Sequence, residues 1–182
     1  QRMLEEYRLD SLDDLADEII ARSEKSVRSA IEQVPDGVYR AEGVIEQMEG
    51  QKDINIKAAV EIKGSDISVD LAGSSPQVSW GGNVVYNFTF AYVHMAIKSI
   101  FDPDIPNNHG SVAVIKLDAP EGSVVNCRFP AAVAARMQIG HFMAEIIYRA
   151  LAQALPHRVI ASSGGTPATM NVFYGTFNNG KP

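Results

Sequence analysis

Every second residue of the stretch 54–62 is apolar, and this alternation constrains the fold more than any other feature of the sequence. Successive side chains of a β-strand point to opposite faces, so the pattern predicts a strand with one buried face. Strand-like runs at 38–48 and 67–71 flank it, joined by the short glycine-containing segments EGQKD and KGSD. Joins of this length favour hairpins over parallel crossovers, so the three runs predict an antiparallel meander.

Three amphipathic helices are expected around the meander. Apolar residues recur at helical spacing from Leu12 to Val34, over 86–101 up to the Asp-Pro stop at 102–103, and over 132–154. Gly140 interrupts the last helix, where a glycine costs about 1 kcal/mol relative to alanine, so it indicates close packing or a nearby ligand.

The segment SVAVIKL (111–117) reads as one more strand, after the turn-rich loop DPDIPNNHG. Together these elements predict an α+β fold in which the meander packs against the amphipathic helices. We divide the chain into a helical leader, residues 1–34, and an α+β domain, residues 35–182.

Both ends of the chain read as interior to a longer polypeptide. The opening QRMLEEYRL has helical spacing without an initiator methionine or a capping residue before it. At the other end TMNVFYGTF alternates like a strand, and NNGKP supplies an Asn-Gly hairpin turn without a returning strand. We interpret the chain as the central part of a larger protein, with a short natural subunit as the alternative.

Composition excludes several classes of partner. The net charge of −6 and the scattered Lys and Arg residues argue against nucleic acid, because phosphate binding needs clustered positive charge. No apolar run approaches the roughly eighteen residues of a membrane span, so we expect no membrane partner. Cys127 is the one cysteine, which excludes an internal disulfide and favours a reducing, cytoplasmic compartment.

The segment DLAGSSPQVSWGGN (70–83) lies between a predicted strand and a predicted helix, where a phosphate-binding loop would be found. It lacks the lysine of a P-loop and the glycine spacing of a dinucleotide fingerprint, so we expect no ATP site in it. Two interpretations stay open at this point: a plain connection, or a surface that meets a substrate or a partner. The residues available to such a surface are Ser74, Ser75, Trp80, Asn83 and Asn87.

His109 and His141 are the remaining candidates for a base or a substrate contact, although each fits a structural role as well. The sequence has no His-Glu-x-x-His motif, no pair of metal ligands at helical spacing and no Gly-x-Ser-x-Gly elbow. We therefore assign no metal ligand and no cofactor to this chain, and its catalytic residues stay unknown.

Four segments resemble the B-type subunit of the hydantoinase and oxoprolinase family, which also includes subunits of acetone and acetophenone carboxylases. They are IEQVPDGVYRAEG, ISVDLAGSSPQVSWGGN, FDPDIPNNHGSVAVIKLDAPEGSVVNCRFPAAVAAR and RALAQALPHRVIASSGGT, and they occur in the family order. The resemblance covers about residues 1–178. Family members carry a Gly-Asn pair where this chain has Gly82 and Asn83, which favours a binding or interface role for that loop.

The resemblance implies an enzyme component. It implies a longer protein with a histidine-rich segment outside this chain, an A-type subunit or domain that binds ATP, and a divalent metal in the full enzyme. The implied substrate is a small cyclic amide that is hydrolysed, such as a hydantoin or oxoproline, or else a ketone that is carboxylated. The residues do not decide between these reactions, and a non-catalytic assembly domain is a third alternative.

Overall fold

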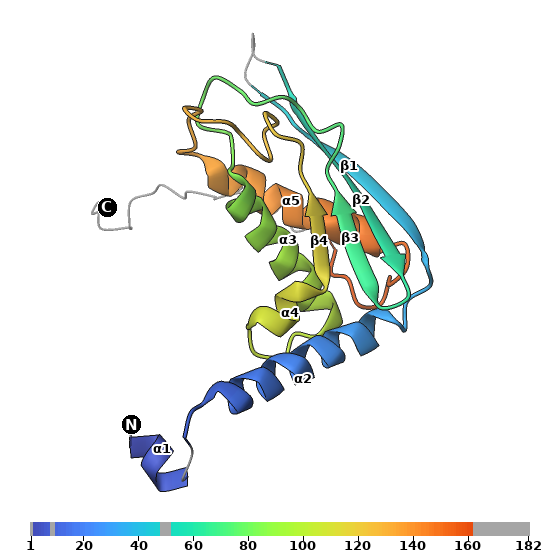
Figure 1. The fold of residues 1–182 in the computed structure, drawn as a ribbon. Helices are drawn as coiled ribbons and strands as arrows, with labels where there is room; N and C mark the ends of the chain where they lie inside the picture. Colours follow the sequence, from blue (N-terminus) through green and yellow to red (C-terminus); the bar gives the residue numbers. More distant parts are fainter. Residues whose placement is uncertain (1, 8–9, 48–51, 162–182) are drawn as a thin grey trace, which may run out of the picture.

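The computed structural model describes residues 2–7, 10–47 and 52–161, and it confirms an α+β fold (Figure 1). The strand and turn expected from TMNVFYGTF and NNGKP lie outside the described residues. In chain order the elements are α1 (Arg2–Tyr7), α2 (Asp13–Ile31), β1 (Gly37–Ile45), β2 (Ile54–Lys63), β3 (Asp66–Asp70), α3 (Tyr86–Phe101), α4 (His109–Ala113), β4 (Ile115–Asp118) and α5 (Arg136–Leu151).

The four strands form one sheet in the order β1-β2-β3-β4. The expected meander is confirmed, because β1 pairs antiparallel with β2 and β2 pairs antiparallel with β3. β4 joins β3 in parallel, with Ile67 opposite Ile115. A parallel neighbour needs a long crossover, which α3 and α4 supply.

The apolar side chains that alternate along β2 all point to one face of the sheet, and this face is buried in the core. α5 lies across this face and contacts β1 and β2, while α3 runs beside α5 (Figure 1). Gly43 on β1 permits the approach, since a Cβ there would lie 2.6 Å from Cδ1 of Ile146 on α5. The buried residues of β2 are Ile54, Ile56, Ala58, Val60 and Ile62.

The strand expected at 111–117 is wrong in its first half, because His109–Ala113 forms the short helix α4. Asn108 caps this helix: its Oδ1 accepts hydrogen bonds from the backbone N–H groups of Gly110 and Ser111, and Ser111 Oγ accepts one from Asn108 N–H. Gly110 also lies directly against the backbone of Ile20 on α2, where an added Cβ would collide with the Ile20 carbonyl. The strand therefore begins only at Ile115.

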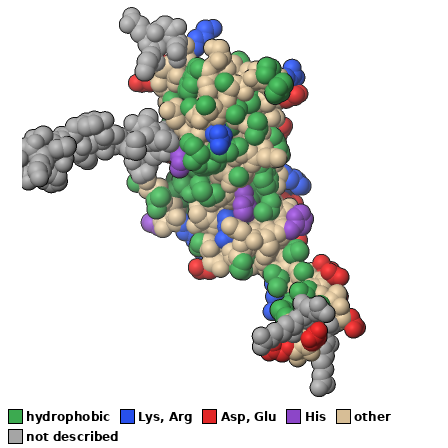
Figure 2. Space-filling model, turned by 90° about the vertical axis from the view of Figure 1, so that its left-hand side faces the viewer, with side chains coloured by type: hydrophobic (Ala, Val, Ile, Leu, Met, Phe, Trp, Pro, Cys, Tyr) green, Lys and Arg blue, Asp and Glu red, His purple; other side chains and the backbone are tan. Residues whose placement is uncertain are grey.

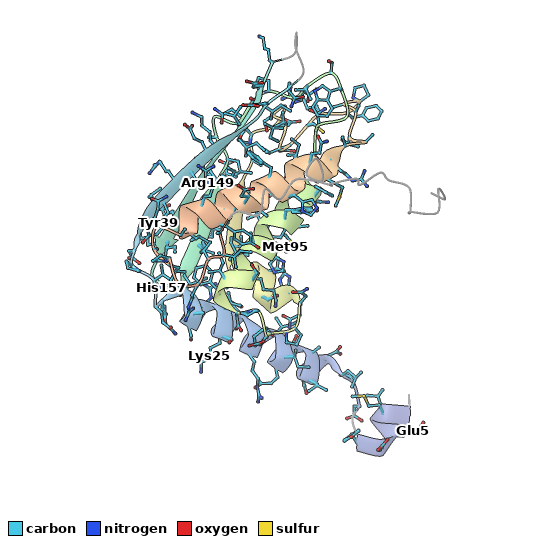
Figure 3. All side chains as sticks on the ribbon, turned by 180° about the vertical axis from the view of Figure 1, so that it is seen from behind. Glu5, Lys25, Tyr39, Met95, Arg149 and His157 are labelled. Atoms are coloured by element: carbon cyan, nitrogen blue, oxygen red, sulfur yellow. The ribbon has the colours of Figure 1, made fainter. Side chains whose placement is uncertain are left out.

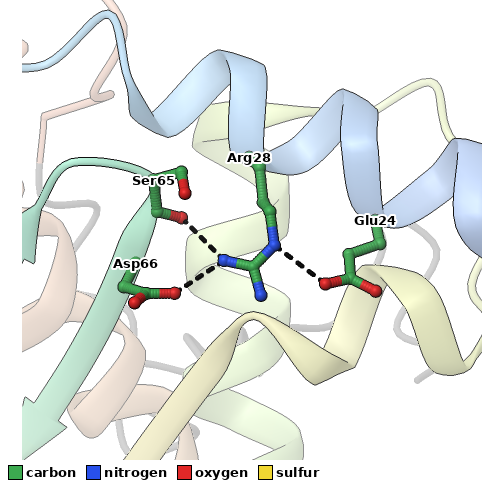
Figure 4. Close-up of polar contacts among 4 residues, drawn as sticks. All are labelled: Glu24, Arg28, Ser65 and Asp66. Carbon is green, nitrogen blue, oxygen red and sulfur yellow. Dashed lines mark hydrogen bonds and ion pairs between the residues drawn. The ribbon is translucent and has the colours of Figure 1, made fainter.

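The C-terminal half of α2 packs on the body of the fold, where Ser23, Val27 and Ile31 are buried. Arg28 anchors it to the β2–β3 turn, since its guanidinium donates to Glu24 at 2.8 Å, to Asp66 at 2.6 Å and to the Ser65 carbonyl at 3.3 Å (Figure 4). The hydrogen bond from Arg28 lowers the pKa of the Asp66 carboxyl.

The N-terminal half of α2 differs from the expectation of one continuous buried stripe. Leu12, Leu15 and Ile19 are exposed, and at about 100° per residue they lie to one side of the face that Val27 and Ile31 bury further along the helix. This half projects from the body of the fold toward α1 (Figure 1).

Candidate functional site

Two loops that are far apart in the sequence form one hydrogen-bonded unit at one end of the sheet. Residues 71–85 connect β3 to α3, and residues 119–135 connect β4 to α5. We call them the paired loops. Their bonds explain why α5 begins at 136 and not at the expected 132, because the residues before it belong to the loop. Backbone bonds join Gln77 N–H to Gly122 O (2.9 Å), Val84 N–H to Val124 O (2.8 Å), Cys127 N–H to Val84 O (2.9 Å) and Ala135 N–H to Gly81 O (2.8 Å).

Ser74 and Ser75 continue the sheet where β3 ends. Ser75 Oγ accepts a hydrogen bond from Asn55 N–H at 2.9 Å, and Ser74 Oγ accepts one from Lys57 N–H at 3.1 Å. Both hydroxyls therefore satisfy backbone donors of β2 that β3 no longer reaches.

Asn83 is the internal anchor of the paired loops. Its side chain is fully buried, Oδ1 accepts from Val78 N–H at 2.7 Å, and Nδ2 donates to the carbonyls of Val78, Trp80 and Ala132 at 2.9 to 3.0 Å. The bond to Ala132 crosses from the first loop to the second. The Asn83 amide thus positions the loop surface and is itself occupied within the fold.

Two more residues expected from the sequence lie on the paired loops and at the start of α3. Trp80 is half-buried with its ring packed against Gly82, where a Cβ would collide with the indole, and Asn87 is exposed in the first turn of α3. Sequence reasoning missed Phe129, which is 98% exposed in the second loop. A large apolar side chain in a proline-containing turn was the available signal.

His141 lies elsewhere, on the second turn of α5. Its ring meets Tyr92 of α3 edge-on, with 5.4 Å between ring centroids. His141, Glu145 and Arg149 recur at four-residue intervals on α5 and border a hollow of about 280 Å³. Met95 of α3 borders the same hollow; Figure 3 labels it together with Arg149. Sequence reasoning missed Glu145 and Arg149, although their helical spacing from His141 was visible.

A second hollow, of about 630 Å³, is lined by charged side chains of the sheet and α5. Lys57 and Glu42 form an ion pair at 3.1 Å within it, and Gln153 Nε2 donates to the Arg40 carbonyl at 2.7 Å. Arg149 borders both hollows. This region was not anticipated from the sequence.

His109 is not brought together with these residues. It is exposed at the start of α4, the short helix that packs on α2, whereas the paired loops lie at the opposite end of the sheet (Figure 1). The seven residues expected from the sequence therefore occupy three regions of the fold: the paired loops with the start of α3, α5, and α4.

No group of three His, Cys, Asp or Glu side chains is placed to hold a metal ion among the residues that the structure describes. The divalent metal that the resemblance implies is thus not placed on any of these described residues. Within the same described ranges, no helix is long and apolar enough to cross a bilayer.

A known family matches almost the whole of this chain. The family model for hydantoinase B/oxoprolinase matches residues 1–181. The chain belongs to this family. It is 35% identical over 174 residues to a protein of Pseudomonas sp. (strain NS671) described as the B-type subunit of a D-/L-hydantoinase, covering 89% of this chain and 29% of that protein.

Solved structures agree with this assignment. The ATP-dependent caprolactamase of Pseudomonas jessenii superposes with a TM-score of 0.80 at 27% identity, over 88% of this chain and 28% of the other. A nucleotide-free structure of acetone carboxylase superposes with a TM-score of 0.65 at 14% identity, over 75% of this chain and 20% of the other, and shows the fold alone. The chain spans less than a third of the length of the relatives it matches.

Proposed function

We propose that this chain is part of a B-type subunit in an ATP-dependent enzyme that hydrolyses a cyclic amide. The observation that carries the proposal is the similarity to the ATP-dependent caprolactamase, at 27% identity and a TM-score of 0.80 over 88% of the chain. The similarity to acetone carboxylase is at 14% identity and concerns the fold, so it favours the carboxylase reaction less.

In this proposal the chain contributes binding and assembly surface, and ATP is used on an A-type subunit or domain. The support from the sequence is the missing P-loop lysine, and the support from the structure is the internal use of Ser74, Ser75 and Asn83. Loops held rigidly from within are suited to present a few outward side chains to a substrate or a subunit. Trp80 and Phe129 are those side chains on the paired loops, Asn87 is one at the start of α3, and His141 is the corresponding candidate on α5.

The test uses the full-length protein that contains this chain, produced together with its A-type partner. Hydantoin, 5-oxoproline and caprolactam are each incubated with ATP, and the ring-opened acid is measured by mass spectrometry. Acetone with bicarbonate is the parallel substrate. We expect an ATP-dependent ring-opened product from a cyclic amide. Carboxylated acetone without any ring-opened product would contradict the proposal and support the carboxylase alternative.

The role of the chain within the enzyme is tested by Phe129→Ala and His141→Ala. His157→Ala is the matched control, because His157 is exposed and does not line the hollow that His141 borders. We expect at least one of the first two variants to reduce turnover or assembly at unchanged thermal stability, and the control to do neither. If all three behave as wild type in turnover and assembly, these surfaces have no role and the chain serves only as an architectural core.

A further inference from the structure

β1 is an edge strand of the sheet, because within the described part of the chain it pairs with β2 alone (Figure 1). It is long and regular: its nine residues pair with β2 one to one, without a bulge, and none of them is a proline. Natural proteins usually interrupt an open edge by such features, since its free backbone groups pair readily with another strand. β1 thus has a regular edge that is suited to pairing.

The bonds around β2 show which backbone groups of β1 lie at this edge. Asn55 and Lys57 of β2 bond through their backbone to the serines at 74–75, on the side away from β1. The alternate residues of β2 therefore bond to β1, as Ala58 does opposite Ala41. The residues of β1 whose N–H and C=O groups point away from β2 are thus Val38, Arg40, Glu42 and Val44.

Within the described residues, hydrogen-bond partners are nearly absent along this edge. The exception is the Arg40 carbonyl, to which Gln153 Nε2 donates at 2.7 Å. Gln153 follows α5 and is exposed, so its amide can turn away. A hollow of about 630 Å³ adjoins the same stretch, and its lining includes Arg40, Glu42 and Arg149, the last of which Figure 3 labels on α5. The edge therefore has both unpaired backbone groups and space beside it.

The side chains along this edge complement their own order read backwards. In chain order the outward residues are apolar, basic, acidic and apolar, and all lie on the outer face of the sheet: Val38, Arg40, Glu42 and Val44. The two valines are 42% and 52% exposed. Two copies paired antiparallel about a two-fold axis at Ala41 would place each Arg40 opposite Glu42 of the other copy. Each Val38 would then lie opposite Val44 of the other copy.

The charges select this register over its neighbours. An axis at position 40 would face Arg40 with Arg40, and an axis at position 42 would face Glu42 with Glu42. Opposite charges across a strand pair stabilise it, and like charges destabilise it. Arg40 has no ion pair within the described residues, and Lys57 contacts Oε2 of Glu42 at 3.1 Å, which leaves Oε1 for an arginine of another copy. At the axis, the small side chain of Ala41 fits the close approach of a non-hydrogen-bonded pair.

We propose that β1 pairs with β1 of a second copy of the protein, antiparallel and centred on Ala41, so that two sheets join into one. The outward backbone groups would provide the hydrogen bonds, and the contacts between Arg40 and Glu42 would fix the register. A second copy is the occupant because β1 itself has, in reverse, the order of side chains that its edge requires. The inference goes beyond the proposed hydrolysis of a cyclic amide and does not depend on it.

The first test reverses the charges in the full-length protein that contains this chain. Arg40→Glu would place carboxylates against carboxylates, and Glu42→Arg would place cations against cations. Each variant alone should therefore dimerise at least about tenfold more weakly than wild type in sedimentation equilibrium. A mixture of the two variants restores opposite charges at both contacts, so it should form a mixed dimer about as tightly as wild type.

Glu61→Arg and Lys25→Glu are the matched controls, because they make the same charge changes at exposed positions of β2 and α2. Both should dimerise like wild type. Figure 2 shows the side of the molecule on which α3 lies, away from β1, and hydrophobic side chains gather there as well. A dimer formed through that side would survive both charge reversals. Such survival, a mixture that associates no better than its components, or a monomeric full-length protein would overturn the proposal.

The second test measures the register. In the proposed pairing, position 41 lies opposite itself with about 4.5 Å between Cα atoms, which is within disulfide range. Ala41→Cys should therefore form a disulfide between two copies under mild oxidation, identified by mass spectrometry of the linked peptides. Val38→Cys is the control: Val38 is more accessible to chance collision, yet in this register it lies about 20 Å from its own counterpart. Any pattern other than a disulfide at 41 and none at 38 would refute the pairing and leave the proposed cyclic amide reaction untouched.

Discussion

Gly140 of α5 lies against the ring of Tyr92 on α3, so that a Cβ at position 140 would be 2.6 Å from Tyr92 Cε2. Phe88 approaches the same point, with its Cε1 at 2.8 Å from that Cβ. The glycine therefore permits the close crossing of α3 and α5. Of the two meanings that the sequence left open for Gly140, close packing is the one that the structure supports.

Gly140→Ala should destabilise the fold by about 1 to 3 kcal/mol, because the added methyl must displace two aromatic rings and this cost exceeds the gain in helix propensity. Chemical denaturation followed by circular dichroism measures the effect. Gly37→Ala is the matched control, because its Cβ would meet Tyr39 at an ordinary 3.4 Å. Similar stability of the Gly140→Ala variant and wild type would show that the rings move aside freely.

Asn83→Ala should lower the unfolding free energy by about 1 to 3 kcal/mol, because it leaves partly buried backbone groups of Val78, Trp80 and Ala132 without this partner. Asn87→Ala removes an exposed amide from the adjacent helix and should stay within about 0.5 kcal/mol of wild type. Thermal and denaturant unfolding compare the two. A loss of activity in Asn83→Ala without a loss of stability would instead assign this amide to ligand contact.

Ile56→Asp should destabilise by about 3 to 5 kcal/mol, because Ile56 is fully buried on the core face of β2 and the carboxylate would have no partner there. Val44→Asp on β1, where the native side chain is 52% exposed, should cost less than about 1 kcal/mol. Equal losses in urea titrations of the two variants would mean that the face of the sheet is misassigned.

The pH dependence of stability should include a contribution from His94 on α3. Burial lowers the pKa of His94 below its ordinary value of 6.5, and Lys98 acts in the same direction, against a hydrogen bond with the backbone of Ser111. The unfolded chain then binds the proton more readily than the folded one, so this contribution is full above pH 6.5 and is lost as the pH falls through the folded pKa.

His94→Phe should remove that part of the acid sensitivity, which is measured as the unfolding free energy between pH 7.5 and pH 5.5. His157→Phe, at an exposed position, is the control and should retain the wild-type slope. An unchanged slope in His94→Phe would place the sensitivity on other groups.

The sequence predicted the elements whose side chains repeat with a clear period. The alternation of apolar residues in β2 predicted its buried face, and the helical spacing of apolar residues in α3 predicted its bounds. Both patterns arise because an element buried on one side repeats its apolar residues with the period of that element. The segment that forms α4 is predicted as a strand when its alternating Val112 and Val114 are considered. Asn108 and Ser111, whose side chains cap the helix, are the sequence signal that indicates a helix instead.

The candidate site was harder to predict, because its residues are defined by contacts between distant segments. Asn83 looked like an outward amide in a glycine-rich loop, and only the partner Ala132, 49 residues away, shows why it is buried. Asn55 is a similar case: it alternates with core residues, yet its Oδ1 is buried without a partner, so Asn55→Asp would place a charge where the pattern alone suggests solvent.

The pairing of the two loops sets an order of folding. The meander closes through short hairpins, whereas Gly81 and Ala135 meet only after α3, α4 and β4 are in place, and contacts across such separations form late because of their entropy cost. In pulsed hydrogen exchange, the amides of Val84 and Cys127 should therefore gain protection after those of Ile56 and Val60. A chain arrested between these stages would already have its sheet while still lacking the paired-loop surface that we propose to meet a substrate or a subunit.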